Sequence, residues 1–329
     1  MSADFSSLGL AVGHATDERG ATGCTVIRGT DGPLRGGVAI FGRATGSREL
    51  AAVTPPHVAD RVDAVFFTGG SAYGLDAAAG VMRWMEERGR GHGVPGGVVP
   101  IVPAAVIFDL APLGRFDARP TAEMAYAACE VASASEIAEG SVGAGTGATV
   151  GKIDGPARAM KGGVGCALVS SGGLHVAAIT VVNALGDVRD GSGRIIAGAR
   201  NTQNGFVDTA ARIAGADESR SERAASLTMQ NTTLALVATN LPLERVALAQ
   251  LARAAGAALF RRITPTGTTV DGDVVFALSR HGGGTGSRDN APLSTLQVEA
   301  LAVQALEEAI ERAVRMARGR DGVPGLADA

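Results

Sequence analysis

A polar tripeptide stands directly before an apolar run in the segment QNTTLALVATN, residues 230–240. The hydroxyl of Thr232 lies next to the carbonyl of Asn231, and a hydroxyl in that position can act as a nucleophile toward its own chain. Three ordinary explanations compete. Asn-x-Thr is a glycosylation acceptor in secreted proteins, and a polar triplet can form the turn before a strand. Threonine is also common at the start of a strand without any special role. Taken alone, the tripeptide favours the ordinary explanations.

Two aspartates, Asp271 and Asp273, precede an apolar run in TTVDGDVVFAL, residues 268–278. An Asp-Gly turn that caps a strand is the ordinary explanation and by itself the better one. If both carboxylates face one site instead, repulsion between their charges separates their protonation, which suits acid–base chemistry.

A glycine-rich loop, GAGTGATVGK, ends at Lys152. It fits a dinucleotide-binding pattern only loosely, because the preceding SEIAEGSV is a poor strand and no clean βαβ unit follows. It also misses the phosphate-binding P-loop, because Gly147 stands four residues before Gly151 rather than five, and Ile153 replaces the metal-binding hydroxyl. Lys152 is then either a surface lysine at a turn or a charge held close to a site.

Other candidate motifs are weaker. GGSAYGL, residues 69–75, has Tyr73 where a nucleophile elbow needs glycine, so we expect Ser71 to be a helix N-cap. The five histidines never fall at metal-ligand spacing, and we expect no metal. Spacing alone leaves a histidine triad open, but nothing in the sequence supports one.

The composition is that of an ordinary soluble globular protein, with 329 residues, 46% of them hydrophobic, and a formal net charge of -3. Neither nucleic acid nor a membrane is expected as a partner. The first residues do not form a secretory signal, and the three cysteines stand apart, so a cytoplasmic location is expected and glycosylation at Asn231 is not. The longest apolar stretch, residues 96–108, is broken by Pro100 and Pro103, so no transmembrane helix is predicted.

The pattern along the chain predicts a mixed α/β protein in one compact domain, residues 1–329. The 191–230 and 279–292 segments are polar and glycine-containing, which predicts loops and places a mobile connection just before Thr232. The remaining elements follow from periodicity and stop signals: strands in residues 62–70, 175–183, 231–240 and 272–280, and helices in residues 71–89, 243–260 and 294–319.

These pieces, in this order, resemble the L-aminopeptidase/D-esterase (DmpA-like) hydrolases, which include β-aminopeptidases and the nylon-oligomer hydrolase. The resemblance covers nearly the whole chain and rests on FFTGGSAYGLDAAAGVMRWMEERG, VPIVPAAVIFDL, VGAGTGATVGK, ARAMKGGVG, VVNALGDV, NTTLALVATN and DGDVVFAL. It implies a four-layer αββα sandwich, the fold shared with ornithine acetyltransferase. It also implies a precursor that cuts itself before a Ser or Thr, no cofactor, a small peptide or amide substrate, and assembly of processed αβ units into a homo-oligomer.

The resemblance also assigns residues. The bond to be cut matches Asn231-Thr232 and would give fragments 1–231 and 232–329. Lys152, Asn183 and the two aspartates of DGD, Asp271 and Asp273, fall where the nylon-oligomer hydrolase carries its active-site residues; the better-known aminopeptidases have Ser and Glu at the DGD positions and Ser as the nucleophile.

One position departs from the family pattern. Phe108 matches the place where characterised aminopeptidases carry a tyrosine whose hydroxyl lies near the oxyanion, and a phenylalanine has no hydroxyl to donate. Oxyanion stabilisation must therefore come from Asn183, from backbone NH groups or from another residue.

The expected chemistry follows from these assignments. Thr232 attacks the Asn231 carbonyl, water hydrolyses the resulting ester, and the freed α-amine, with a reference pKa of about 7.7–8.0, serves as general base for its own hydroxyl. Asn183 donates to the oxyanion, the two aspartates orient the ammonium or bind the substrate amine, and Lys152 balances their charge. The prediction is an N-terminal-nucleophile amidohydrolase or aminopeptidase. The alternatives are an acyl transferase of the ornithine acetyltransferase type and a non-catalytic family member.

Overall fold

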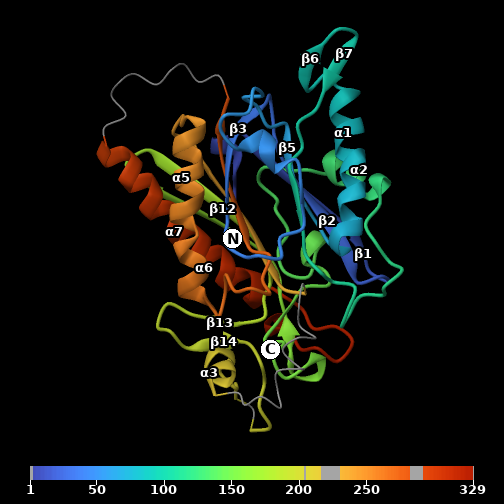
Figure 1. Ribbon diagram of the computed structural model, residues 1–329, viewed down its shortest axis with the longest axis vertical. Helices are drawn as coiled ribbons and strands as arrows, with labels where there is room; N and C mark the ends of the chain where they lie inside the picture. Colours follow the sequence, from blue (N-terminus) through green and yellow to red (C-terminus); the bar gives the residue numbers. More distant parts are fainter. Residues whose placement is uncertain (1–2, 204, 216–229, 282–291, 329) are drawn as a thin grey trace.

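The structure is a computed structural model that describes residues 3–203, 205–215, 230–281 and 292–328 (Figure 1). Two five-stranded sheets form its centre. The first has the order β1 (Leu10–Asp17), β2 (Thr22–Gly29), β5 (Ala64–Thr68), β8 (Ala104–Val106) and β4 (Ser47–Arg48). The second has the order β11 (Gly163–Ser171), β12 (Leu174–Asn183), β15 (Thr232–Thr239), β17 (Val274–Arg280) and β3 (Leu34–Ile40).

The other elements surround these sheets. The short strands are β6 (His92–Val94), β7 (Gly97–Val99), β9 (Thr149–Val150), β10 (Met160–Lys161), β13 (Asp187–Arg189), β14 (Ile195–Ala197) and β16 (Ile263–Thr264). The helices are α1 (Ala78–Glu86), α2 (Ala122–Glu130), α3 (Thr209–Ala214), α5 (Arg245–Ala255), α6 (Ala257–Arg262) and α7 (Pro292–Arg315). Figure 1 shows α1 and α2 on one side of the two sheets, and α5, α6 and α7 on the other.

Strand alternation explains the four layers. In β15, Leu234 and Leu236 belong to the apolar core between the two sheets, whereas Ala235 and Val237 belong to the core that the second sheet forms with α5, α6 and α7. Successive side chains of a strand point to opposite faces, so a strand that is covered on both faces must be apolar throughout. The expected αββα sandwich is therefore confirmed.

The first sheet shows the same pattern. In β5, Val65 and Phe67 face the core between the sheets, and Phe66 packs with α1 and α2 in a third cluster. Among the described residues, no helix is both long and apolar enough to cross a membrane.

The predicted strands are confirmed, and the predicted helices differ in three details. Residues 71–77 form a 3-10 helix before α1, and the Ser71 side chain caps neither segment, so the N-cap prediction was wrong. Gly70 and Ser71 both have positive φ, and the backbone NH of Ser71 donates to Ile107 O. The second predicted helix breaks into α5 and α6 at Gly256, whose missing side chain leaves room for the Phe41 ring. The last, α7, ends at Arg315, before Gly319.

The two predicted loops are only partly described. The first contains β14 and α3, so its prediction as a structureless connection was wrong for those residues. Residues 216–229 and 282–291 lie outside the described residues.

Candidate active site

Three strand ends meet at one edge of the second sheet. β12 runs antiparallel to β15, and its last residue, Asn183, pairs with Thr232, the first residue of β15. β15 and β17 are parallel, so their starts lie at the same edge, and Asn231 forms a bridge with Asp271 just before β17. Residues that are far apart in the sequence are therefore neighbours because of strand direction and register.

Two groups of the described chain donate to the carbonyl of Asn231. Thr232 Oγ1 donates to Asn231 O at 2.7 Å, and the Gly272 backbone NH donates to the same oxygen at 2.8 Å. A backbone NH aimed at a carbonyl oxygen can stabilise the negative charge that develops there during nucleophilic attack. Thr232 is 5% exposed, so this pair is nearly removed from solvent.

Gly272 is a residue that sequence reasoning missed. A Cβ at position 272 would lie 2.7 Å from Thr232 Oγ1 and 2.8 Å from the Ala44 carbonyl oxygen, so only glycine fits there. The available signal was the glycine between the two aspartates of DGD, which indicates a close backbone approach as well as a turn.

Lys152 is buried, which excludes the alternative of a surface lysine at a turn. Its Nζ donates to Asn183 O at 3.0 Å, to Asn183 Oδ1 at 2.8 Å and to Gln230 O at 2.9 Å. Three acceptors match the three NH donors of an ammonium group. Burial lowers the pKa of Lys152 to about 7, although the charges of Asp271, Asp109 and Asp273 act in the opposite direction.

The backbone of the glycine-rich loop directs Lys152 inward. The Lys152 NH donates to Leu185 O at 3.1 Å, and the Gly151 NH donates to Gly186 O at 3.1 Å. Gly151 has a positive φ of 68°, and a Cβ there would collide with the backbone of Gly198 and Ala199. The loop therefore brings the lysine chain to the end of β12.

Asn183 connects three segments. Its Nδ2 donates to Gln230 O at 3.2 Å and to Phe108 O at 3.1 Å, and its Oδ1 accepts from the Thr149 NH at 3.0 Å as well as from Lys152. In this intact chain the amide thus donates to the carbonyl one residue before that of Asn231.

The two carboxylates are held by separate sets of donors. Asp273 accepts from the Thr233 NH at 2.6 Å, from Thr266 Oγ1 at 2.7 Å and from the Gly267 NH at 2.9 Å. Asp271 accepts from the NH of Thr268 at 2.9 Å and from its hydroxyl at 2.6 Å.

Burial raises the pKa of both carboxyls. The pKa of Asp273 rises to about 6, and the charge of Asp271 also raises it. The pKa of Asp271 rises as well, while hydrogen bonds from Thr268 and the charge of Lys152 act in the opposite direction. Lys152 therefore influences the aspartates through space, because its hydrogen bonds go to neutral oxygens.

A small cavity of about 180 Å³ opens beside Thr232. Phe108 lines it, and the Phe108 carbonyl receives the Asn183 amide, so this residue belongs to the site through both its backbone and its side chain. Arg43, Thr45 and Ser71 supply polar groups to the lining. Of these, only Ser71 was considered from the sequence, and not as part of this site. The other lining residues are Ala44, Gly46, Ala72, Val106 and Thr232. Within the described part of the chain, no cluster of His, Cys, Asp and Glu side chains could hold a metal ion.

Comparison with known proteins agrees with this architecture. The profile of peptidase family S58 matches residues 8–327, which is nearly the whole chain. The chain belongs to peptidase family S58. As a member of a peptidase family, the protein is a hydrolase of amide bonds, as the resemblance predicted.

Two relatives illustrate the range of the family. An uncharacterized aminopeptidase of Mycobacterium leprae is 42% identical over 274 residues, which cover 79% of this chain and 71% of the relative. The 6-aminohexanoate-oligomer endohydrolase of Paenarthrobacter ureafaciens is 32% identical over 281 residues, which cover 84% of this chain and 74% of the relative.

Solved structures support the fold. The L-aminopeptidase D-Ala-esterase/amidase of Ochrobactrum anthropi, described as a variant of the Ntn hydrolase fold, superposes with a TM-score of 0.70 at 20% identity and covers 98% of this chain and 90% of its own. The β-aminopeptidase of a Burkholderia species gives a TM-score of 0.67 at 19% identity, with 99% and 92% covered. This S58 chain therefore has the Ntn-hydrolase fold.

Proposed function

We propose that this S58 peptidase cuts its own chain between Asn231 and Thr232 and then uses Thr232 as the N-terminal nucleophile of an aminopeptidase or amidohydrolase. The observation that supports this most directly is the 2.7 Å hydrogen bond from Thr232 Oγ1 to Asn231 O, with the Gly272 NH on the same oxygen. The hydroxyl lies beside the bond it has to break, and a donor is already in place for the developing charge.

The first step is an acyl shift from nitrogen to oxygen. Thr232 Oγ1 bonds to the Asn231 carbonyl carbon, the bond from that carbon to the Thr232 nitrogen breaks, and the hydroxyl proton passes to the departing nitrogen. Water then hydrolyses the ester, which gives fragments 1–231 and 232–329. The Gly272 NH stabilises the oxyanion, a contribution that is typically about 10²–10³-fold in rate for one donor.

The polar residues around this bond have distinct tasks. Lys152 and Asn183 both donate to Gln230 O, and so they hold the segment on the acyl side of the bond. Asp273 receives the Thr233 NH, which places a carboxylate beside the new terminus. The freed α-amine has a reference pKa of about 7.7–8.0 and serves as general base for the Thr232 hydroxyl.

The names of two relatives support a proposal for the substrate class. Some are called aminopeptidases and others act on 6-aminohexanoate oligomers. We infer that the substrate is a small peptide, an amino-acid amide or a linear oligoamide that presents a free amino terminus. We also propose that the processed units form a homo-oligomer and act in the cytoplasm, a reducing compartment that suits the three buried free cysteines.

Intact-mass analysis of wild-type protein and of Thr232→Val tests the first step. We expect two fragments that separate at Asn231-Thr232 in the wild type and one uncut chain in the variant. Thr233→Val is a matched control, because Thr233 Oγ1 is buried and makes no hydrogen bond to any described residue. This control should be cut like the wild type. A wild-type chain that stays uncut, or a Thr232→Val chain that is still cut, would contradict the proposal.

A second assay tests the reaction class. Processed enzyme should hydrolyse aminoacyl anilides in the absence of any amine acceptor. Turnover that depends strictly on N-acetylornithine and glutamate would indicate an acyl transferase, and an intact chain without turnover would indicate a non-catalytic member; either result overturns the proposed function.

A further inference from the structure

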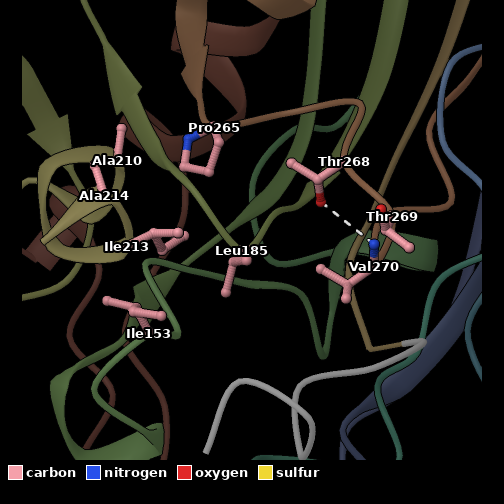
Figure 2. A pocket seen from close by; sticks show the side chains of 9 residues that line it. All are labelled: Ile153, Leu185, Ala210, Ile213, Ala214, Pro265, Thr268, Thr269 and Val270. Atoms are coloured by element: carbon pink, nitrogen blue, oxygen red, sulfur yellow. Dashed lines mark hydrogen bonds between the residues drawn. The ribbon is translucent and has the colours of Figure 1, made fainter. Parts of the chain in front are cut away.

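An apolar pocket of about 380 Å³ lies between α3, the residues around Leu185 and the loop before Asp271. Figure 2 shows the nine described side chains that line it, and among these nine Thr268 and Thr269 are the polar ones. The Thr268 hydroxyl already bonds to Asp271 at 2.6 Å. None of the nine lining side chains is charged, so the pocket suits a hydrocarbon group rather than an ion.

Three segments that line the pocket adjoin catalytic residues, either in the chain or through a backbone hydrogen bond. Ile153 follows Lys152 directly, and the Lys152 NH donates to Leu185 O at 3.1 Å. Val270 directly precedes Asp271, which forms the bridge with Asn231. Three of the segments that line the pocket are therefore adjacent to the backbone of the active site.

These segments lie on the acyl side of the bond to be cut. Gln230 and Asn231 precede Thr232, and the groups that hold them are Lys152, Asn183 and Asp271. Lys152 and Asp271 each stand directly next to a lining residue in the chain, and Asn183 stands two residues before Leu185. The cavity that Thr232 itself lines is a different one, with Arg43 and Phe108 in its wall. A substrate whose acyl residue replaces Asn231 therefore has the apolar pocket beside it.

The exposed fraction of one lining residue also supports a binding role for the pocket. Ile213, on α3, is 41% exposed although it lines an apolar hollow, and an exposed hollow of this kind commonly marks a binding site. Figure 2 shows Leu185 between Ile153 and Ile213 on one side and Thr268 and Val270 on the other.

We propose that this pocket binds an apolar side chain on the acyl residue of the substrate, so that the enzyme prefers amides of branched aliphatic or aromatic amino acids. The inference rests on the proposed function, because it assigns the acyl side of the bond from the Thr232 nucleophile. It adds the specificity that the catalytic residues by themselves do not provide.

Kinetics of processed enzyme on leucine and glycine p-nitroanilides test the inference. Burial of the leucine side chain should raise kcat/KM on the order of 10- to 100-fold over the glycine compound. Ala214→Phe fills the pocket from α3 and should lower the ratio of leucine to glycine kcat/KM at least about tenfold. Ala211→Phe is the matched control, because Ala211 is exposed on the same helix but does not line the pocket, and it should keep the wild-type ratio.

The outcomes separate the two proposals. If the wild type is not cut or hydrolyses neither anilide, the proposed function fails. If the wild type is cut and hydrolyses both, but shows no preference for leucine or keeps its preference in Ala214→Phe, only the inference about the pocket is overturned. Because the glycine compound reports folded, active enzyme in each variant, a folding defect in Ala214→Phe would lower both rates and leave their ratio unchanged.

Discussion

Lys152 and Lys161 are both buried, and each donates to three oxygen atoms, but the oxygens differ in where they lie. Lys161 Nζ donates to the carbonyls of Gly145 at 3.3 Å, Thr146 at 2.8 Å and Ala148 at 2.7 Å, all within one loop. Lys152 Nζ donates to Asn183 and to Gln230, the residue before Asn231.

The two lysines have similar electrostatics. Burial lowers the pKa of each to about 7, and carboxylates act in the opposite direction, among them Asp109 in both cases. A perturbed pKa is often taken as a sign of a functional site, but structural networks perturb pKa values as well. The location of the acceptors distinguishes the two: Lys161 fixes a loop, whereas Lys152 holds the segment that is to be cut.

Lys161 and Lys152 are also connected through one continuous stretch of chain. The loop that Lys161 holds continues into Thr149, whose NH donates to Asn183 Oδ1, and then into Lys152. Lys161 therefore acts as a positioning residue, and its effect on the reaction should be indirect and smaller than that of Lys152.

The largest expected effect comes from Lys152→Met. This variant removes the ammonium group that donates to both Gln230 O and Asn183. We expect self-cleavage to slow about 10³-fold, because the acyl segment is no longer held in the reactive geometry. The rate is measured as the appearance of fragment 232–329 in freshly synthesised protein. Lys161→Met is the matched control and should slow cleavage less than about tenfold. Equal rates in the two variants would remove the distinction between the lysines.

The second effect is on stability and should be larger for Lys161. Lys161 is 1% exposed and Lys152 is 6% exposed, so water replaces the lost donor less easily at Lys161. In a Thr232→Val background, which keeps every chain uncut, we expect Lys161→Met to lower the free energy of unfolding by about 2 kcal/mol at pH 7. Urea denaturation measures this. If Lys161→Met lowered the free energy of unfolding less than Lys152→Met does, the prediction that Lys161 contributes more to stability would be wrong.

The contrast between these lysines also shows what the sequence could predict. Lys152 was a candidate because a glycine-rich loop presented it, but the sequence left open whether it lay on the surface, since that depends on contacts with Asn183 and Gln230. Lys161 stood in a motif that carried the family resemblance, yet nothing local indicated that its ammonium would meet three carbonyls of a separate loop.

Secondary-structure elements and long-range contacts also differed in how well the sequence predicted them. The strands β5, β12, β15 and β17 were predictable, because a strand buried on both faces is a continuous apolar run. The Gly272 donor and the pocket on α3 were not, because each depends on contacts between segments far apart in the chain. The six residues of α3 are too few to show a helical period within a polar stretch.

The smallest effect, the pH dependence of stability, tests whether the two lysines share one electrostatic behaviour. These lysines have a pKa of about 7 in the folded chain and about 10.4 in the unfolded chain. At a pH between these two values, the lysine is mostly deprotonated in the folded chain and mostly protonated in the unfolded chain. The unfolded state then binds more protons, so the free energy of unfolding rises with pH, by up to about 1.4 kcal/mol per pH unit. Each methionine variant lacks this contribution.

We therefore expect the stability difference between the Thr232→Val parent and either methionine variant to grow from pH 7 to pH 9, with similar slopes for Lys152 and Lys161. The series starts at pH 7 because burial raises the pKa of Asp109 and of Asp273 to about 6, so that both are mostly ionised above it. If three carbonyl acceptors keep the ammonium of Lys161 protonated to its ordinary pKa, the difference for that lysine stays flat over the range. A slope for Lys152 alone would mean that its site, and not burial as such, changes the charge of the lysine near neutral pH.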